Sequence, residues 1–225
     1  PFLKRSRMFS SRWNRLRREQ LLKSDIRDLT RISEIDQLGA LAEILANRSG
    51  EQLVYKALGN EVKIDEKTAK SWTVALKHLF YGFEIRPWYK NVENSIRKTP
   101  KWFLRDWALV VEPGKRFETM VACHLLKAVE GWTDLGLGEF ELFYIRDKQK
   151  HEVDFMVTRD HEPWMLVEAK QGERKLSENL IRFAGKLKVQ YAFQVVKELS
   201  YENVDLFKCE RPVVAPARTF FSQLL

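Results

Sequence analysis

The feature that most constrains the fold is a pair of neighbouring apolar runs whose ends carry charged side chains. From His151 to Lys170 the chain reads H-E-V-D-F-M-V-T-R-D-H-E-P-W-M-L-V-E-A-K. Apolar and polar residues alternate in the first run, so we expect two antiparallel strands joined by a tight turn at Arg159–Glu162. Such a hairpin brings Asp154 close to Glu168. Lys170 points to the same face as Glu168, because side chains repeat along a strand with a period of two.

This arrangement predicts a site for a divalent metal ion at one end of a sheet. Two carboxylates supply the oxygen ligands that Mg²⁺ and Mn²⁺ prefer, and the lysine places a cation beside them. A metal ion in such a site lowers the pKa of a bound water and screens the charge that develops on a phosphate, which suits hydrolysis of a phosphodiester. The alternative is a chance match, since carboxylates and lysines at strand ends are common on solvated surfaces.

The elements expected around the hairpin follow the order αβββαβ. Their residues are 115–130 (helix), 140–146, 152–158 and 163–169 (strands), 177–187 (helix) and 189–196 (strand). Together with the D…(E)xK pattern, this order resembles the core of the PD-(D/E)xK nuclease-like superfamily. Glu118 falls in the first helix, where the resemblance implies a further acid that faces the metal. Superfamily members can also keep the fold as a binding or structural unit, so the resemblance supports the fold more than the activity.

Four short blocks resemble, more narrowly, the C-terminal portion of bacterial and archaeal AAA+-type ATPases, the DUF4143 family. The blocks are K-x-P-K-W-F-L-R-D-W (98–107), G-K-R-F-E-T-M-V-A-C-H-L (114–125), E-V-D-F (152–155) and V-E-A-K (167–170). We expect this resemblance to cover most of the chain. It departs at Thr119, where the family is expected to have Asn, but the departure leaves Glu118 intact. Because the first residue is Pro1 rather than Met, we expect the chain to be a piece of a longer protein that contains the ATPase.

The resemblance also implies a role for each residue of the site. Asp154, Glu168 and Lys170 are the expected catalytic residues, and Lys170 would orient the attacking water or stabilise the transition state. The expected metal ligands are Glu118, Asp154, Glu168 and the backbone carbonyl of Ala169, with Mg or Mn as the cofactor. Without a metal ion, the three carboxylates would crowd like charges and raise one another's pKa.

Positive charge is concentrated at the N-terminus. The chain has a net charge of +8, and residues 1–31 alone hold ten Lys or Arg against three acids. Such a segment can neutralise phosphates or bind an acidic partner. The alternative is a solvated basic helix, and we expect a basic helical linker from a preceding domain at residues 1–33. The residues expected to contact nucleic acid are Arg12, Arg15, Arg17, Arg18, Lys67, Lys70, Arg146 and Lys175.

Residues 34–98 predict a helical unit of the helix-turn-helix or winged-helix type. The helices expected from apolar spacing and capping are 34–48, 52–58 and a third that begins after Asp65, with a turn at Gly59-Asn60 and a strand at 83–88. Lys67 and Lys70 would lie on the polar side of the third helix, where a DNA-recognition helix carries its contacts. The alternative is a protein–protein spacer, since Glu66 at the leading end of that helix would repel phosphate.

Other classes of protein are excluded by missing motifs. Neither Gly-Lys pair has the context G-x-x-x-x-G-K-[ST], so we expect no ATP hydrolysis by this chain alone. No apolar run approaches about 18 residues and no signal peptide is present, so we expect no membrane partner. Cys123 and Cys209 form no C-x-x-C motif, which argues against a zinc site or a disulfide framework and fits the cytoplasm.

The combined prediction is an α/β chain with two parts. A winged-helix-like unit at residues 34–98 precedes a PD-(D/E)xK nuclease-like domain at 99–225. The leading function is metal-dependent cleavage of nucleic acid, with DNA as the expected substrate, by a domain that follows an AAA+-type ATPase module. The alternatives are a non-catalytic DNA- or protein-binding module of that ATPase and a DNA-binding regulator that works through the helix-turn-helix alone. Oligomers are expected to form through the ATPase.

Overall fold

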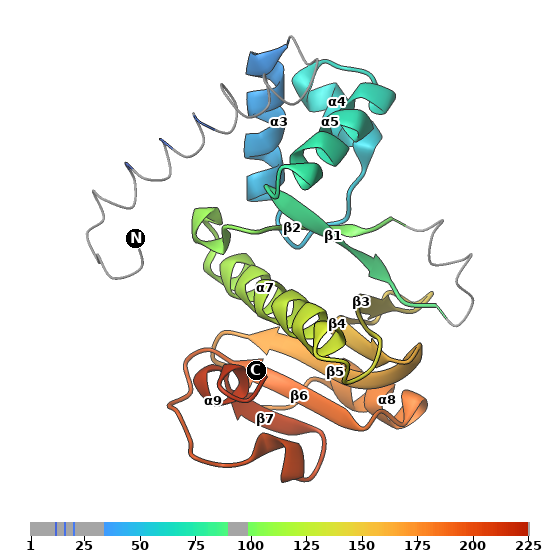
Figure 1. Ribbon diagram of the computed structural model, residues 1–225, viewed down its shortest axis with the longest axis vertical. Helices are drawn as coiled ribbons and strands as arrows, with labels where there is room; N and C mark the ends of the chain where they lie inside the picture. The colour runs from blue at the N-terminus through green and yellow to red at the C-terminus, as the bar shows by residue number, and fades with distance from the viewer. Residues whose placement is uncertain (1–11, 13–15, 17–19, 21–33, 90–98, 225) are drawn as a thin grey trace.

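The chain folds around one mixed β-sheet with helices on both faces (Figure 1). In this computed structural model, residues 34–89 and 99–224 are described, together with Arg12, Leu16 and Gln20. The strands are β1 (Gly82–Pro87), β2 (Lys101–Leu104), β3 (Phe140–Arg146), β4 (Glu152–Arg159), β5 (Glu162–Lys170), β6 (Tyr191–Val196) and β7 (Val213–Pro216). The α-helices are α3 (Ile35–Asn47), α4 (Tyr55–Val62), α5 (Glu66–His78), α7 (Pro113–Asp134), α8 (Glu178–Leu187) and α9 (Ala217–Phe221). The strand order is β2-β1-β3-β4-β5-β6-β7.

The helices α3, α4 and α5 form a small unit with its own core, at one end of the molecule in Figure 1. Leu41, Leu58 and Trp72, one from each helix, are buried together, and Trp102 of β2 lies in the same cluster. The third helix begins as expected at Asp65, whose carboxylate accepts a hydrogen bond of 3.0 Å from the backbone N–H of Thr68. The winged-helix interpretation of this unit stays a prediction.

The expected second helix, at 52–58, is displaced along the chain. The structure has α4 at Tyr55–Val62, and Gln52 instead forms an isolated bridge with β2. Gly59 is inside the helix because the backbone of Ile64 passes so close that a Cβ at Gly59 would lie 2.6 Å from its carbonyl oxygen. The turn falls at Lys63, which has a left-handed conformation with φ of 58°. The glycine signals close packing here rather than the end of a helix.

One continuous sheet spans the predicted boundary between residues 98 and 99. β1 pairs with β2 in antiparallel register, with Phe83 opposite Phe103. The same β1 pairs with β3 in parallel, with Arg86 opposite Phe143. The strands that follow the helical unit therefore extend the sheet that carries the hairpin β4–β5.

The expected αβββαβ order is present from α7 to β6. β4 and β5 form the expected hairpin, in which Arg159 pairs with Glu162. Asp160 and His161 make the turn with positive φ angles of 51° and 68°, as a two-residue hairpin turn requires. β7 and α9 were not predicted, and β7 adds a strand parallel to β6.

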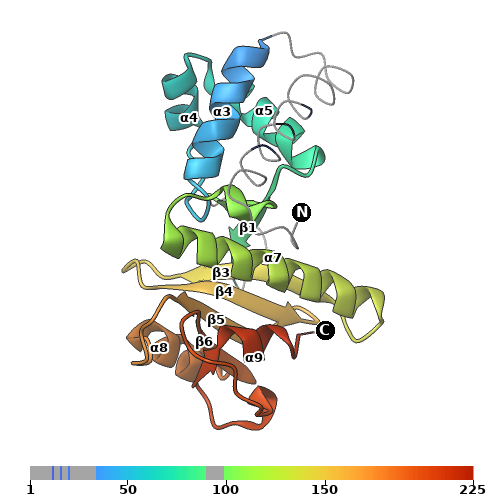
Figure 2. The ribbon, with the colours of Figure 1, turned by 90° about the vertical axis from the view of Figure 1, so that its left-hand side faces the viewer.

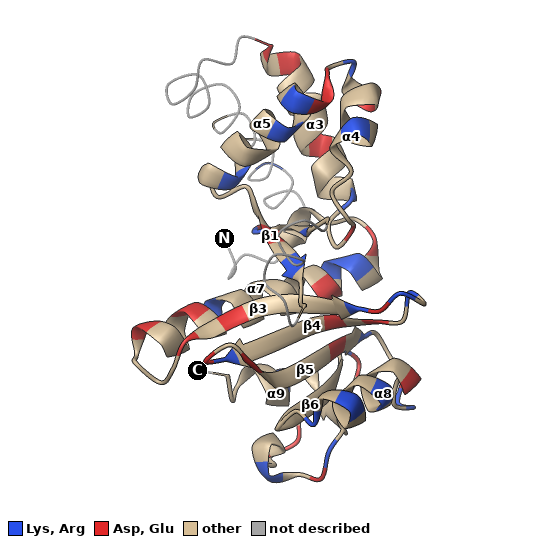
Figure 3. Ribbon diagram, turned by 90° about the vertical axis from the view of Figure 1, so that its right-hand side faces the viewer, with Lys and Arg blue, Asp and Glu red and all other residues tan. Residues whose placement is uncertain are grey.

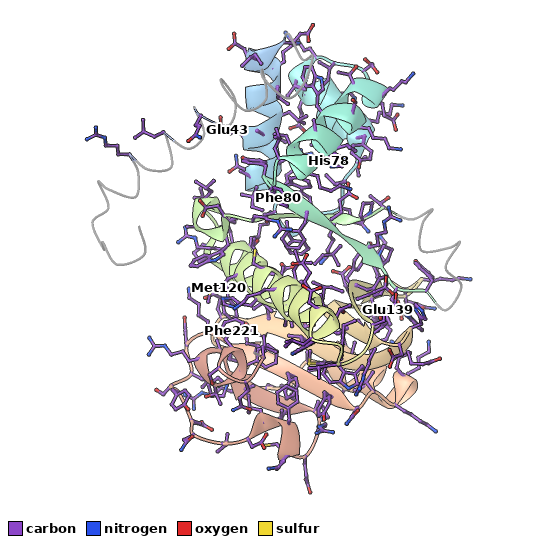
Figure 4. The ribbon with its side chains drawn as sticks, viewed as in Figure 1. Glu43, His78, Phe80, Met120, Glu139 and Phe221 are labelled. Atoms are coloured by element: carbon purple, nitrogen blue, oxygen red, sulfur yellow. The ribbon has the colours of Figure 1, made fainter. Side chains whose placement is uncertain are left out.

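Two apolar layers hold the helices against the sheet. α7 and α9 pack on one face, where Phe117, Val167 and Phe220 belong to one buried cluster. α8 packs on the other face, where Leu166 and Phe183 are buried together. Figure 2 shows α7 running along the sheet, and Figure 4 shows the side chains that fill the layers around α7 and α9. Leu166 and Val167 face opposite sides, as the period of two along a strand requires.

Among the described residues, no helix combines the length and the apolar character that crossing a lipid bilayer demands.

Candidate functional site

The hairpin places Asp154 directly against the end of β5. Asp154 lies near the start of β4 and Ala169 near the end of β5. The backbone N–H of Ala169 donates a hydrogen bond of 2.9 Å to Asp154 Oδ2. Because Glu168 and Lys170 flank Ala169, the two expected acids and the expected lysine come together at one end of two adjacent strands.

Glu168 is a buried carboxylate in which only one of the two oxygens has a partner. Its residue is 5% exposed. Lys170 Nζ lies 3.0 Å from Glu168 Oε1, whereas Glu168 Oε2 is buried and has no hydrogen-bond partner. An unpaired buried polar atom costs about 1–3 kcal/mol, and more when the group is charged. Glu168 therefore offers an oxygen that a cation or a donor could occupy.

Lys101 of β2 is a functional candidate that the sequence prediction missed. Its side chain is 7% exposed, and Nζ lies 2.6 Å from Glu152 Oε1 and 3.4 Å from Glu118 Oε1. The available signal was a lysine at the head of the strongly apolar run W-F-L. Because Lys101 is itself buried, its ammonium group needs a carboxylate or another polar partner. We call Lys101, Glu118, Glu152, Asp154, Glu168 and Lys170 the acid–lysine cluster.

The loop after α3 passes close to Glu118 on α7. A Cβ at Gly50, where φ is +87°, would lie 3.1 Å from Glu118 Oε2, so the loop after α3 needs glycine to pass this close. The neighbouring Thr119, which departs from the expected Asn, is fully buried. Its hydroxyl forms hydrogen bonds with Ser49 Oγ at 2.8 Å and with the Lys115 carbonyl at 2.6 Å. Thr119 therefore ties α7 to the helical unit beside Glu118.

Burial shifts the pKa values of the acids strongly. It raises the pKa of Glu118 to about 8, with the charge of Asp154 adding to the effect and Lys101 opposing it. It also raises the pKa of Glu168 to about 7, again with help from Asp154 and opposition from Lys170. The pKa of Asp154 is raised by burial as well. The acids therefore repel one another as expected, and the cluster favours an added cation or proton.

The two lysines remain charged. Burial alone would lower the pKa of Lys101, but the charges of Glu118, Asp154 and Glu152 outweigh it and hold that pKa above its usual value. Burial and Glu168 compete in the same way at Lys170, whose pKa is also raised. Figure 3 shows acidic segments of α7, β4 and β5 gathered on one side of the molecule.

The donors of the acid–lysine cluster fit a hard divalent cation in part. Asp154 and Glu168 supply oxygen ligands, and the unpaired Oε2 of Glu168 is the kind of atom that a metal ion would satisfy. Within residues 34–89 and 99–224, however, no group of three or more His, Cys, Asp or Glu side chains is arranged to hold a metal ion. Glu118 is paired with Lys101 instead. Asp154 and Glu168 are the pair that fits, and the ligand set with Glu118 and the Ala169 carbonyl stays a prediction.

A buried glutamine fixes the loop that lies beside the cluster. Gln194 of β6 lies opposite Glu168 in the parallel register and is fully buried. Its amide nitrogen donates to the carbonyls of Glu173 and Lys175, both at 2.9 Å, and its oxygen accepts from the backbone N–H of Ser177 at 2.8 Å. One side chain therefore holds the loop between β5 and α8 next to the cluster. This residue was not predicted, because its partners are three backbone groups.

The residues expected to contact nucleic acid are spread over the molecule. Arg146 lies 3.5 Å from Glu152 at the edge of the cluster, and Lys175, on the loop after β5, is exposed and 3.7 Å from Glu178. Lys67 and Lys70 are exposed on α5, and Arg12 is exposed. The remaining three, Arg15, Arg17 and Arg18, and most of the expected linker at 1–33, lie outside the described residues.

Comparison with known families divides the chain into two matched regions. Residues 2–113 match the family model of DUF8612, a domain of unknown function. The DUF4143 model, also of a domain of unknown function, begins at residue 113, so the block at 98–107 falls in the other region and the DUF4143 resemblance covers less of the chain than expected. No curated protein and no solved structure gave a significant match. The four acids of the acid–lysine cluster thus lie in the second region, whereas Lys101 lies in the first. The chain carries a DUF4143 domain at residues 113–219.

Proposed function

We propose that this chain is a metal-dependent, nuclease-like protein that acts on nucleic acid, with DNA as the preferred substrate. The observation that carries the proposal is the end of the β4–β5 hairpin. There Asp154 accepts from the Ala169 N–H, and Glu168, paired with Lys170, keeps one buried oxygen unpaired. Two carboxylates and a lysine at adjacent strand ends are the chemistry that the PD-(D/E)xK resemblance implies. The nuclease-like assignment rests on that resemblance and this geometry.

Asp154 and Glu168 would hold a Mg²⁺ or Mn²⁺ ion. When bound, such an ion supplies a Lewis acid that lowers the pKa of water and neutralises charge on a phosphate. The chain's own residues do the rest. Glu168 holds the ammonium of Lys170 at 3.0 Å, so that the lysine can donate to the attacking water or to a phosphate oxygen. The Ala169 N–H fixes the carboxylate of Asp154.

Nucleic acid would reach the cluster over basic side chains on separate elements. Arg146 is next to Glu152, and Lys175 stands on the loop beside Glu168's strand, so both can hold phosphates that flank the bond to be cleaved. If the helical unit acts as a winged helix, Lys67 and Lys70 on α5 would contact DNA at a distance from the acid–lysine cluster. The net charge of +8 favours a polyanionic partner. In line with the DUF4143 resemblance, we propose that an AAA+-type ATPase of the same protein drives or gates this unit and sets its oligomeric state.

The test is cleavage of single- and double-stranded DNA and RNA in Mg²⁺ or Mn²⁺. Wild type should cleave at least one substrate, and Asp154→Asn and Glu168→Gln should not. Asp160→Asn makes the same substitution at the exposed turn of the same hairpin and should cleave like wild type. Cleavage that survives in both Asp154→Asn and Glu168→Gln would show that the reaction does not occur at this site.

The second candidate is a non-catalytic module that binds DNA or protein and regulates the ATPase. The pairing of Glu118 with Lys101 favours it, because that acid is not free to join Asp154 and Glu168. Binding of nucleic acid without cleavage in either metal ion would select this candidate.

A further inference from the structure

Lys101 places a buried cation inside the acid–lysine cluster. Its ammonium nitrogen lies 2.6 Å from Glu152 Oε1 and 3.4 Å from Glu118 Oε1. The same nitrogen stands 5.4 Å from the centre of the Tyr144 ring. Removing an ammonium group from water is costly unless nearby charges and hydrogen bonds compensate. The acids therefore hold Lys101 in place, and Lys101 in turn holds the acids.

The backbone of Lys101 is fixed on both sides. Ile85 of β1 pairs with Lys101 in the antiparallel register. On the other side, Gln52 forms a bridge with Lys101. The next residue, Trp102, donates its N–H to the Glu51 carbonyl at 2.9 Å. The starting point of the side chain is therefore fixed, and its burial limits where the ammonium group can lie.

The charges of the cluster are distributed unequally. Glu118 and Glu152 share Lys101, and Arg146 adds a contact of 3.5 Å to Glu152. Glu168 has the ammonium of Lys170 as its ion-pair partner, Asp154 accepts from one backbone N–H, and the charge of Lys101 also attracts Asp154. A cation that enters the cluster therefore finds the unpaired Oε2 of Glu168 next to the Asp154 carboxylate, whereas Glu118 is already paired with Lys101.

We infer that Lys101 is a positioning residue that withholds Glu118 from a metal ion at Asp154 and Glu168, and so weakens metal binding at the proposed site. The inference rests on the proposed function and adds a residue that regulates metal binding at the same site. Lys101 lies in the region that matches DUF8612, whereas all four acids lie in the DUF4143 domain. The N-terminal region therefore sets how many carboxylates the site offers, and any displacement of β2 from α7 would release Glu118.

Mn²⁺ binding measured by calorimetry at fixed pH, without substrate, tests the inference. Lys101→Met should bind Mn²⁺ about tenfold more tightly or better, because a nearby positive charge is removed and Glu118 becomes free. Glu118→Gln added to Lys101→Met should remove most of the gain. Lys101→Arg keeps the charge and should bind like wild type. A folded Lys101→Met variant with unchanged or weaker affinity overturns the inference, as does a gain that persists in full without Glu118.

Lys101→Met leaves Glu118 without its cation and Glu152 with Arg146 alone, so this variant can fail to fold. A second measurement therefore uses the native lysine. In the wild-type background, Glu118→Gln should weaken Mn²⁺ binding by less than about threefold, and a larger loss shows that Glu118 is a ligand despite Lys101. Absence of Mn²⁺ binding in every variant also overturns the inference. Absence of cleavage alone, with the expected pattern of Mn²⁺ affinities, contradicts the proposed function and leaves the role of Lys101 standing.

Discussion

Asp154 and Ala169 are joined across the β4–β5 hairpin by a hydrogen bond of 2.9 Å, in which the Ala169 N–H donates to the Asp154 carboxylate. This bond places Asp154 beside the peptide that separates Glu168 from Lys170. The geometry of the pair is therefore set by the backbone of the sheet rather than by flexible side chains, as a precise site requires.

The first prediction concerns Asp154→Asn. Asparagine keeps an oxygen that can accept from the Ala169 N–H, but it loses the charge. Mn²⁺ affinity should fall at least about tenfold, since a carboxylate ligand is replaced by a neutral amide. The midpoint of thermal unfolding should stay the same or rise, because a buried charge with a raised pKa is removed. Calorimetry and thermal unfolding measure both effects, with Asp160→Asn as the control. An unchanged Mn²⁺ affinity would place the metal elsewhere.

The second prediction is a loss of stability as the pH rises. In the folded chain the pKa is about 8 for Glu118 and about 7 for Glu168, against 4.5 when exposed. At a pH between the unfolded pKa and the folded pKa of each acid, the folded state binds more protons than the unfolded state. The free energy of unfolding therefore falls as the pH rises from about 5 to 8. The exposed acids with lowered pKa, such as Glu112 and Glu173, complete their titration below this window. His124, whose pKa is lowered by burial, acts in the opposite direction within the window, but it is one group against two acids.

The unfolding midpoint should drop by at least about 5 °C over this range. Glu118→Gln and Glu168→Gln should each flatten the curve, and Mn²⁺ should restore stability at pH 8 because it binds the ionised acids. A midpoint that rises steadily from pH 5 to 8 would contradict the burial of these two charges.

The hairpin and its three charged residues could be predicted because the information is local. Asp154 and Lys170 are separated by a single turn, and the alternation along both strands fixes which side chains share a face. The helix that carries Glu118 was expected at residues 115–130, and α7 (Pro113–Asp134) contains that range. Thus the order of elements from α7 to β6 follows from short stretches of sequence.

Lys101, Gln194 and Gly50 could not be predicted in the same way. Lys101 reaches the cluster only because β2 pairs with β1, and that pairing in turn depends on how β1 joins β3. Gln194 contacts backbone groups, which leave no mark in the sequence of their residues. In the sequence, Gly50 is indistinguishable from a glycine that ends a helix, although α3 ends at Asn47 and Gly50 instead packs close to Glu118. Long-range contacts of this kind depend on the finished fold.

The third prediction concerns Gln194→Ala. The substitution leaves three backbone groups of the loop 173–177 without their partner, which should cost about 1–3 kcal/mol. The loop beside Glu168 should open, so limited proteolysis should cut there first. Gln37→Ala, which removes a single hydrogen bond of 3.3 Å to the Val62 carbonyl, is the control and should change little. Equal stability of Gln194→Ala and wild type would mean that the loop is held by other contacts.

The fourth prediction concerns the basic N-terminal segment. Residues 1–31 hold ten Lys or Arg against three acids, so binding to nucleic acid should weaken steeply as the salt concentration rises. Deletion of residues 1–31 should lower the affinity and flatten this dependence. Fluorescence anisotropy with labelled DNA at several salt concentrations measures the slope. If the deletion leaves the slope unchanged, the segment serves a neighbouring domain or an acidic partner instead.

The last prediction separates a nuclease from a binding module, and it concerns Lys170. The lysine compensates the buried carboxylate of Glu168 at 3.0 Å, so Lys170→Ala should cost about 1–3 kcal/mol of stability, more than a solvated strand-end lysine would. The cost stays moderate because Glu168, with a pKa of about 7, can take up a proton instead. Mn²⁺ affinity should not fall, since a neighbouring positive charge is removed. Cleavage should nevertheless drop by about 10²–10³, the usual effect of losing one donor to a transition state.

Two companions of Lys170→Ala sharpen its result. Lys208→Ala, which removes an exposed lysine that pairs with Asp205 and has no role in the proposed site, should cleave at a rate close to that of wild type. Lys170→Arg should restore stability better than cleavage, because the guanidinium keeps the charge but is planar and does not give up its proton. Full-rate cleavage by Lys170→Ala would show that the activity comes from elsewhere. If wild type cleaves no nucleic acid in either metal ion but still binds it, the ion pair of Glu168 and Lys170 is part of a binding module, and the regulatory function is the correct one.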